Sequence, residues 1–207
     1  MPGVTRPRSE ASRPRSDAYR LDELLDVVVR VFNDRGYDAT SMEDIARATG
    51  RTKSSIYHHV QGKEHLLQLA LARAIDALYA VLDEPGSTSG PAVERLEHVV
   101  RRSVQVLATH LPYVTLLLRV RGNTTVEREA LARRRAFDRR LSALVRQAVA
   151  EGDVRADLDP RLVTRLLFGT VNSLVEWFRP GGEHGRREVE DAVVALALDG
   201  IRPRPGR

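Results

Sequence analysis

The chain has 207 residues, which is long enough for one large domain or for a small domain joined to a larger one. Hydrophobic residues make up 42% and charged residues 29%, which excludes a disordered chain, and the absence of cysteine excludes disulfides and cysteine-based nucleophiles or metal sites. The formal net charge of +5 favours polyanionic partners, although the distribution of basic residues matters more than their total.

The sequence predicts neither a membrane span nor a secretion signal. Arg, Asp or Glu interrupts every apolar run before it reaches the length of a span, and the N-terminus lacks the apolar core of a signal peptide. We therefore expect a cytoplasmic protein with no membrane partner.

Residues 1–19 have the composition of a flexible basic arm. They combine prolines with arginines and carry almost no large apolar residue. Two interpretations stay open: a solvated leader without a role, or a segment that contacts phosphates or enters the minor groove of DNA.

From Arg20 onward, apolar residues recur at spacings of three and four, which predicts helices throughout. Turn residues such as Gly36 and Gly152 separate these segments, and no strand pattern or internal repeat is present. We predict an all-α fold of about nine helices, with a loop over residues 84–91. The expected helices cover residues 21–35, 42–49, 53–60, 63–82, 91–109, 112–118, 125–151, 161–178 and 187–201.

The stretch from Ser41 to Val60 has the pattern of a helix-turn-helix. This motif needs a small residue where its helices touch, a turn residue that tolerates positive φ, and an apolar anchor in its second helix. Ala46, Gly50 and Ile56 supply these three features at the expected offsets. Taken alone, such spacings also occur in ordinary helical hairpins.

Capping residues mark the starts of both helices in this stretch. Thr40 or Ser41 can cap the first helix, with an acidic residue three positions later completing a capping box, and Thr52 can cap the second. The free N–H groups at capped helix starts attract phosphate, which points to Thr40, Ser41 and the helix start at Lys63.

The second helix can be read by rotation at about 100° per residue. With Ile56 pointing inward, Ser54 and His58 lie on nearly the opposite side, and the positions beside them complete a polar face suited to base edges and phosphates. The residues beside them are Lys53 and Tyr57 on one edge and Ser55 and His59 on the other. Adjacent helical histidines point apart, so this pair is not a metal site, whereas Tyr57 is also compatible with plain packing.

Residues 20–67 resemble the DNA-binding domain of the tetracycline-repressor (TetR) family of bacterial regulators. The resemblance rests on the string Phe32, Gly36, Tyr37, Thr40, Ser41, Met42, Ile45, Ala46, Gly50, Ser55, Ile56, Tyr57, His58, His59, Val60, Lys63, Glu64, Leu66 and Leu67. It implies a dimer that binds a palindrome, with phosphate contacts from Thr40 or Ser41, Tyr57 and Lys63. Val60 departs from the usual Phe, and Arg51-Thr52 replaces the commoner apolar-Ser pair, so Arg51 is a further candidate for a phosphate contact.

Residues 20–66 are thus expected to bind DNA, and residues 67–207 to bind a ligand and form the dimer. The helix over residues 161–178 is apolar on most sides, and the last helix carries small residues suited to close helix packing. The resemblance implies a four-helix interface made by these two helices of each subunit. The alternative is that both helices serve an intramolecular core.

The segment of residues 169–182 is similar to TetR-like regulators of lipid and aromatic-acid catabolism, including the FadR type, which respond to acyl-coenzyme A thioesters. Arginines on the preceding helices, including Arg133 and Arg134, suit the phosphates of coenzyme A, although each is also compatible with a solvated face. Trp177 is equally compatible with a core or an interface. The candidate ligand-binding residues are Arg119, Arg121, Arg135, Phe168, Asn172, Trp177 and Arg179.

The sequence therefore predicts a transcriptional regulator: a repressor released from a palindromic operator by a small apolar effector, best matched by an acyl-coenzyme A. Two alternatives are a TetR-like regulator of an efflux pump that responds to hydrophobic drugs, and an architectural DNA-binding protein without a ligand. An enzyme is not expected, because no nucleophile elbow, phosphate loop or zinc-binding motif is present. The acidic loop 153–159 lacks a matching set of metal ligands, so neither metal nor cofactor is expected.

Overall fold

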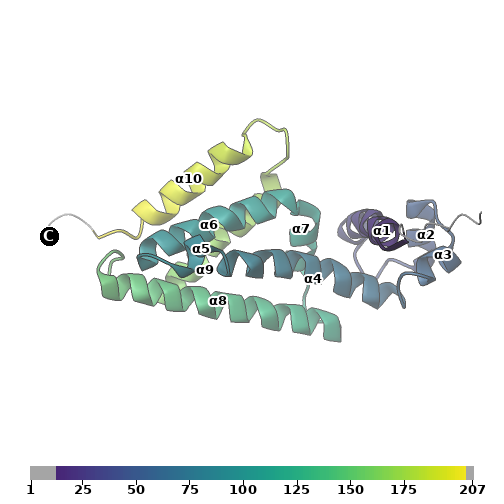
Figure 1. Cartoon of the computed structure of the whole chain (residues 1–207), viewed down its shortest axis with the longest axis horizontal. Coiled ribbons are helices and arrows are strands. Elements are labelled where there is room, and N and C mark those ends of the chain that lie inside the picture. Colours follow the sequence, from purple (N-terminus) through teal and green to yellow (C-terminus); the bar gives the residue numbers. More distant parts are fainter. Residues whose placement is uncertain (1–12, 204–207) are drawn as a thin grey trace, which may run out of the picture. The chain divides into compact units, whose positions relative to one another are not determined.

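The computed structural model describes residues 13–203, with side chains from residue 20 onward, and every regular element in this range is a helix. The all-α prediction is confirmed, with ten helices where about nine were expected (Figure 1). The helices are α1 (Arg13–Arg35), α2 (Met42–Thr49), α3 (Lys53–Tyr57), α4 (Lys63–Leu82), α5 (Pro85–Thr88), α6 (Ala92–Thr109), α7 (Leu111–Arg119), α8 (Thr125–Glu151), α9 (Pro160–Trp177) and α10 (Arg186–Asp199).

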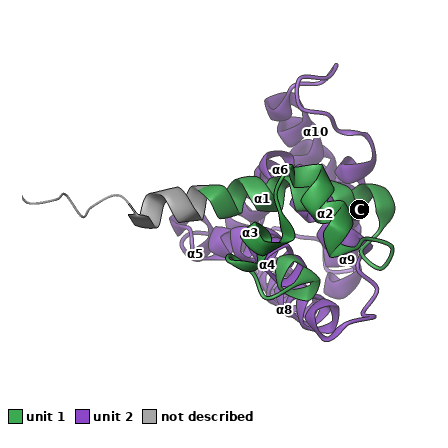
Figure 2. Cartoon of the chain, turned by 90° about the vertical axis from the view of Figure 1, so that its right-hand side faces the viewer, with its two compact units in different colours: residues 1–66 green, residues 67–207 purple. Residues whose placement is uncertain are grey.

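The chain divides into two compact units, residues 1–66 and 67–207 (Figure 2). Unit 1 contains α1, α2, α3 and the start of α4, and α2 packs against both α1 and α3. Its core consists of the fully buried side chains of Leu24, Val28, Phe32, Ile45 and Ile56. These residues include the apolar stripe of the first helix and the expected anchors of both helices of the motif.

The first helix begins earlier than the sequence predicts. It starts at Arg13, so residues 13–19 extend α1 instead of belonging to the expected flexible arm. Proline at an early helical position is compatible with a helix, because its missing N–H has no intrahelical partner there. Residues 1–12 of the expected arm lie outside the described residues.

Unit 2 is organised around α6, which packs against α5, α8, α9 and α10 and lies between α8 and α10 (Figure 1). The buried side of α6 is a stripe of Leu96, Val99, Val100, Val104 and Leu107. Because these positions recur every three or four residues, one face of α6 meets its neighbours along its length. The core of unit 2 therefore runs along this helix.

Two further segments differ from expectation. The segment 84–91, expected to be a loop, contains the short helix α5, which starts at Pro85 and is tied to the end of α4 by a hydrogen bond of 2.5 Å from Ser87 Oγ to the Val81 carbonyl. In addition, α3 ends at Tyr57 and not at Val60. The Ile56 carbonyl accepts the N–H groups of both His59 and Val60, which tightens the chain into a turn.

One described helix, α4, has the length and apolar composition of a membrane span, although Arg73 and Asp76 interrupt its apolar run as expected. Its apolar side chains, however, belong to the protein core: Leu66, Leu67, Ala70, Leu71 and Ala74 are almost fully buried. A buried core helix meets the same criteria of length and composition, so α4 gives no argument for a membrane.

Candidate DNA-binding surface and effector pocket

The start of α2 is held by a complete capping box between Ser41 and Asp44. Ser41 Oγ accepts the Asp44 N–H at 3.2 Å, and the Asp44 carboxylate accepts the Ser41 N–H at 3.0 Å. The Ser41 hydroxyl also donates to the Asp44 carboxylate at 2.6 Å, and this bond, together with the one from the Ser41 N–H, keeps the pKa of the Asp44 carboxyl below its ordinary value. The cap is therefore Ser41 and its partner Asp44, a choice that the sequence left open.

The turn between α2 and α3 depends on Gly50, which adopts a left-handed conformation with φ of 64° and ψ of 19°. This conformation is costly for residues with a Cβ, so glycine suits the position. Directly after the turn, Thr52 Oγ1 accepts the Ser55 N–H at 3.2 Å and caps α3, as expected. The turn between α2 and α3 and the start of α3 therefore depend on residues that are close together in the sequence.

The exposed face of α3 lies opposite its buried anchor. Ile56 is completely buried, whereas Thr52, Lys53, Ser54, Tyr57 and His58 are exposed. Three further candidates, namely Arg51, Ser55 and His59, are half-buried at the edges of this face. Hydroxyl, imidazole and ammonium groups thus gather on one surface that can donate and accept hydrogen bonds.

Acidic neighbours hold the two basic side chains of this surface in the free chain. Lys53 forms an ion pair and hydrogen bond with Glu43 of α2, which raises the pKa of Lys53 and lowers that of Glu43. Arg51 lies 3.6 Å from the Glu23 carboxylate of α1. Both ion pairs are exposed enough for a phosphate to replace the carboxylate.

Two candidate phosphate contacts have other partners in this structure. Thr40 is buried, with only 2% of its surface exposed, and its hydroxyl donates to the Gly36 carbonyl at 2.7 Å. Its N–H is bonded to the Tyr37 carbonyl, so the side chain and N–H of Thr40 both serve the fold. Lys63 donates to the same Tyr37 carbonyl at 2.9 Å and lies 4.3 Å above the Tyr37 ring.

Unit 2 contains a small apolar cavity of about 50 Å³ lined by residues of α4, α6, α7, α8 and α9. An aromatic cluster forms part of its wall: the ring of Phe137 lies 5.8 Å from that of Tyr79 and 5.6 Å from that of Phe168. Ligand pockets of proteins usually measure about 300–1,000 Å³. A ligand larger than a few atoms must therefore push these helices apart.

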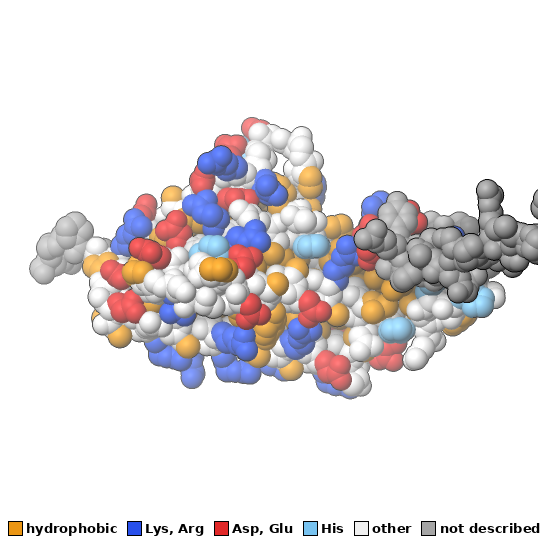
Figure 3. All heavy atoms as spheres, in the orientation of Figure 1, with side chains coloured by type: hydrophobic (Ala, Val, Ile, Leu, Met, Phe, Trp, Pro, Cys, Tyr) orange, Lys and Arg blue, Asp and Glu red, His pale blue; other side chains and the backbone are white. Residues whose placement is uncertain are grey.

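Two of the seven predicted ligand residues, Phe168 and Asn172, line this cavity. The other five do not line it, and all of them are exposed. These five are Arg119, Arg121, Arg135, Trp177 and Arg179. The basic side chains of α8 form an exposed arginine-rich edge (Figure 3). The exposure of these arginines agrees with the alternative that each of them lies on a solvated face of its helix.

The polar side chains that line the cavity are those of Tyr79, Ser103, Arg134, Asp138 and Asn172. The sequence predicted Asn172 as a ligand residue and Arg134 as one of several arginines suited to coenzyme A phosphates. Arg134 donates to the Leu117 carbonyl at 3.2 Å, and burial lowers its pKa. Partial burial also raises the pKa of Asp138, against the opposing effect of Arg134. Arg134 and Asp138 are four residues apart on α8, so their proximity is visible in the sequence, but their position at a cavity is not.

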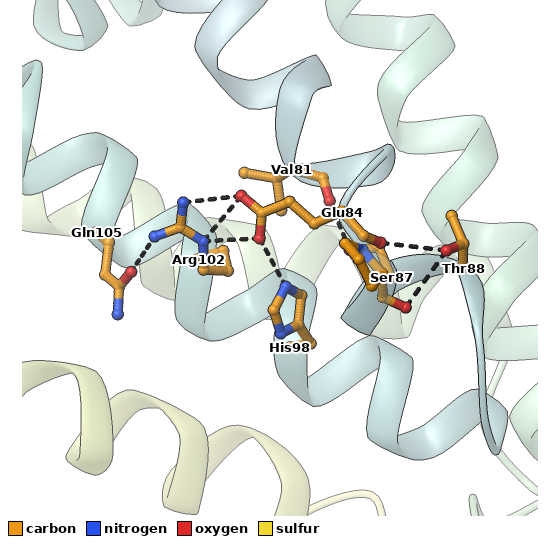
Figure 4. Close-up of polar contacts among 8 residues, drawn as sticks. Val81, Glu84, Ser87, Thr88, His98, Arg102 and Gln105 are labelled. Carbon is orange, nitrogen blue, oxygen red and sulfur yellow. Dashed lines mark hydrogen bonds and ion pairs between the residues drawn. The ribbon is translucent and has the colours of Figure 1, made fainter.

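A polar network joins the end of α4 to α6 (Figure 4). The Glu84 carboxylate accepts hydrogen bonds from Arg102 Nε at 2.8 Å and Arg102 Nη2 at 2.8 Å, and it lies 2.7 Å from His98 Nε2. The hydrogen bonds from Arg102 lower the pKa of Glu84. Gln105 extends the network from Arg102 to Glu190 of α10. The network therefore connects three helices of unit 2.

The outer face of α9 and α10 is apolar yet exposed. Leu162, Leu166 and Trp177 of α9 and Leu196 of α10 each expose more than half of their surface. Most other large hydrophobic residues of the described chain are buried, so this face stands out as a surface suited to a partner. No cluster of candidate metal ligands is found among the described residues.

Two families match the chain over separate segments. Residues 24–70 match the family described as "Bacterial regulatory proteins, tetR family", and residues 89–201 match "Tetracyclin repressor-like, C-terminal domain". Together the two matches cover the helix-turn-helix and most of unit 2.

Two curated relatives match along most of their length. The HTH-type transcriptional repressor KstR2 of Mycobacterium tuberculosis (strain ATCC 25618 / H37Rv) is 31% identical over 191 residues, which is 88% of this chain and 92% of the relative. The fatty acid metabolism regulator protein of Bacillus subtilis (strain 168) is 22% identical over 182 residues, covering 86% of this chain and 94% of the relative.

Two solved structures add to this likeness. SCO3833, a member of the TetR transcriptional regulator family from Streptomyces coelicolor A3, is 54% identical, with a TM-score of 0.81 over 98% of this chain and 97% of that chain. AibR in complex with isovaleryl coenzyme A and operator DNA is 26% identical, with a TM-score of 0.75 over 86% of this chain and 98% of that chain. The family matches and these likenesses support one conclusion: the chain belongs to the tetR family of bacterial regulatory proteins, which are transcriptional regulators and not enzymes.

Proposed function

We propose that this protein is a transcriptional repressor that binds a palindromic operator as a homodimer. The observation that carries the proposal is the polar, exposed face of α3 opposite the buried Ile56, on a helix that is capped at its start. Such a face can enter the major groove and reach base edges, while nearby N–H groups and basic side chains contact phosphates. The relative KstR2 is named as a repressor, which supports the direction of regulation.

The operator contacts come from Ser41, Arg51, Thr52, Lys53, Ser54, Ser55, Tyr57, His58, His59 and Lys63 in this proposal. Thr40 supports their geometry by fixing the segment before α2. The dimer forms through the exposed apolar face of α9 and α10. The protein acts in the cytoplasm, where the DNA lies.

The test uses Tyr57, whose side chain is 51% exposed and whose loss leaves the core of unit 1 intact. Tyr57→Ala should weaken operator binding about tenfold or more, because one contact to a base or phosphate contributes about 1–3 kcal/mol. Gel-shift titration measures the affinity, and sedimentation checks that the dimer persists. Gln68→Ala, an exposed position on α4, is the control. Undiminished affinity of Tyr57→Ala would remove α3 from the DNA interface.

We further propose that the effector is an acyl-coenzyme A thioester, with its acyl group in the cavity of unit 2. The wall of the cavity is mostly aliphatic and aromatic, and AibR, which has a similar fold, was solved with isovaleryl coenzyme A. Ile75, Leu78 and Tyr79 of α4 line the cavity, and α4 begins at Lys63 of the DNA-binding unit. A ligand that enlarges the cavity displaces this helix, which gives effector binding a route to the DNA-binding unit.

A release assay tests the effector class. Labelled operator bound to the protein is titrated with acyl-coenzyme A thioesters, the corresponding free acids and hydrophobic drugs. Release by the thioesters alone is the expected result. Release by the drugs instead would favour the regulator of an efflux pump, and release by no compound would favour an architectural DNA-binding protein.

A further inference from the structure

Ser103 of α6 differs from the other buried serines of the described residues. It is 1% exposed and lines the cavity of unit 2, yet its hydroxyl has no hydrogen-bond partner within the described part of the chain. Ser87 and Ser142 are also buried, but the first donates to the Val81 carbonyl and the second to Thr164 Oγ1 at 3.1 Å. Ser103 is thus a polar group inside an apolar cavity that no protein group satisfies.

A buried hydroxyl without a partner destabilises the protein that contains it, so such groups are rare and need an explanation. A bound molecule that supplies an oxygen to Ser103 removes this cost, whereas a plain hydrocarbon chain leaves the hydroxyl unsatisfied. The cavity therefore favours a ligand with a polar atom near α6 over an equally large ligand without one.

The other polar groups of the cavity are differently placed, and Asn172 of α9 is half-buried, whereas Ser103 is almost completely buried. Tyr79 donates its hydroxyl to the Arg133 carbonyl at 2.9 Å, and Arg134 donates to the Leu117 carbonyl, so both already have partners. Asp138 is exposed, which places it at the opening, whereas Ser103 is fully enclosed. The part of a ligand on the solvent side is therefore expected near Asp138, and its interior part near Ser103.

We infer that Ser103 selects effectors whose acyl group carries an oxygen of its own, a keto or hydroxyl group in the chain or ring, over saturated hydrocarbon acyl groups. This inference rests on the proposed use of the cavity as the effector site. It concerns an oxygen in the acyl body, because the thioester carbonyl lies toward the coenzyme and the opening. Ser103 acts here as a specificity-determining residue, because its hydroxyl can donate one hydrogen bond and can also accept one.

The experiment compares wild type, Ser103→Ala and the matched control Ser142→Ala, which removes a buried but satisfied hydroxyl away from the cavity. The probes are decanoyl-coenzyme A, derivatives of it with one keto oxygen at a middle or distal carbon, and the same set as free acids. Operator release and the ligand-induced shift in Tm are measured for each protein and probe.

We expect at least one keto derivative to bind the wild-type protein about tenfold more tightly than the saturated probe does. Ser103→Ala should abolish this preference without lowering the Tm of the ligand-free protein, while Ser142→Ala should lower that Tm and keep the preference. The inference is overturned if wild type shows no preference, if the preference survives in Ser103→Ala, or if Ser103→Ala lowers the ligand-free Tm as Ser142→Ala does.

The two sets of probes separate this inference from the proposed function. A preference that depends on Ser103 among free acids, with no response to thioesters, refutes the coenzyme A thioester and retains the role of Ser103. Equal responses to all thioesters retain the effector class and refute the role of Ser103. Failure of every probe refutes both.

Discussion

Two basic residues, one on α3 and one just before it, are held by acidic neighbours on the proposed DNA-binding surface. Lys53 and Arg51 are both paired with carboxylates, Glu43 and Glu23 respectively, and neither carboxylate is buried. Exposed ion pairs contribute little to stability, so exchanging a carboxylate for a phosphate costs little. The pairs hold the basic groups near the exposed hydroxyls, where we propose that DNA phosphates replace the carboxylates.

At the scale of single residues, we predict that substitutions of Lys53 and of its ion-pair partner Glu43 have opposite effects on operator affinity. Lys53→Gln should weaken operator binding and reduce the slope of log affinity against log salt concentration by about 0.9, the value for one phosphate contact. Glu43→Gln should strengthen binding at low salt, because it frees Lys53 and removes a negative charge near DNA. Fluorescence anisotropy at several salt concentrations measures both effects.

Arg139→Gln, at an exposed position of α8, is the control for a general loss of positive charge. If Lys53→Gln leaves the salt slope equal to that of the control, Lys53 makes no phosphate contact.

At the scale of elements, short segments are held by polar contacts where apolar burial is small. The end of α4 and the short helix α5 are fixed to α6 through Glu84, Arg102 and His98 (Figure 4). Gly86 permits this arrangement, because a Cβ at its position would lie 2.5 Å from the imidazole of His98. Since α4 also lines the cavity, this network fixes one end of a helix that a ligand is expected to displace.

The pKa of Glu84 gives a prediction with a defined dependence on pH. Arg102 lowers the pKa of Glu84 in the folded protein relative to the unfolded chain. The Glu84 carboxylate therefore stabilises the fold fully at pH values above its pKa in the unfolded chain. This stabilisation is lost as the pH falls through its lower pKa in the folded protein. Glu84→Gln should therefore reduce the free energy of unfolding by about 1 kcal/mol at pH 7, and by less as the pH falls below about 4.

Urea denaturation followed by circular dichroism at several pH values checks this result. Glu129→Gln, at an exposed position on α8, serves as the matched control and should change the stability little. A deficit in Glu84→Gln that stays constant down to pH 3 would contradict an ionic role for Glu84.

At the scale of the whole molecule, the proposed dimer interface on α9 and α10 would link assembly to DNA binding. Leu166 and Leu196 expose 63% and 75% of their surface, whereas most other large hydrophobic residues of the described chain are buried. A symmetric dimer would bury such a face against its own copy, and two DNA-binding units would then bind two half-sites together.

We predict that Leu166→Glu combined with Leu196→Glu converts the dimer to a monomer and weakens operator binding by about a hundredfold or more, because simultaneous binding of both half-sites is lost. Light scattering after size-exclusion chromatography measures the mass, and anisotropy measures the affinity. Ala132→Glu, on an exposed face of α8, should change neither quantity. A double variant that remains a dimer would place the interface elsewhere.

The sequence by itself determined most of the helices, the helix-turn-helix and the family. These features depend on local signals: the apolar spacing within each helix, Gly50 in the turn, and the caps at Ser41 and Thr52. A capping hydrogen bond or a positive φ involves residues within a few positions of one another, so these features can be predicted from the spacing of residues in the sequence. The choice between Thr40 and Ser41 stayed open because both residue types can cap a helix.

The tertiary structure decided which polar groups share a cavity and which apolar groups remain exposed. Ser103, Arg134 and Asn172 lie on three different helices, and packing alone brings them to one wall. The exposure of Leu166 and the burial of Leu167 likewise follow from the orientation of α9 against its neighbours, since adjacent residues of one type look equivalent in sequence. Long-range packing sets these positions, because hydrophobic periodicity shows which side of a helix is apolar but not which other helices meet it.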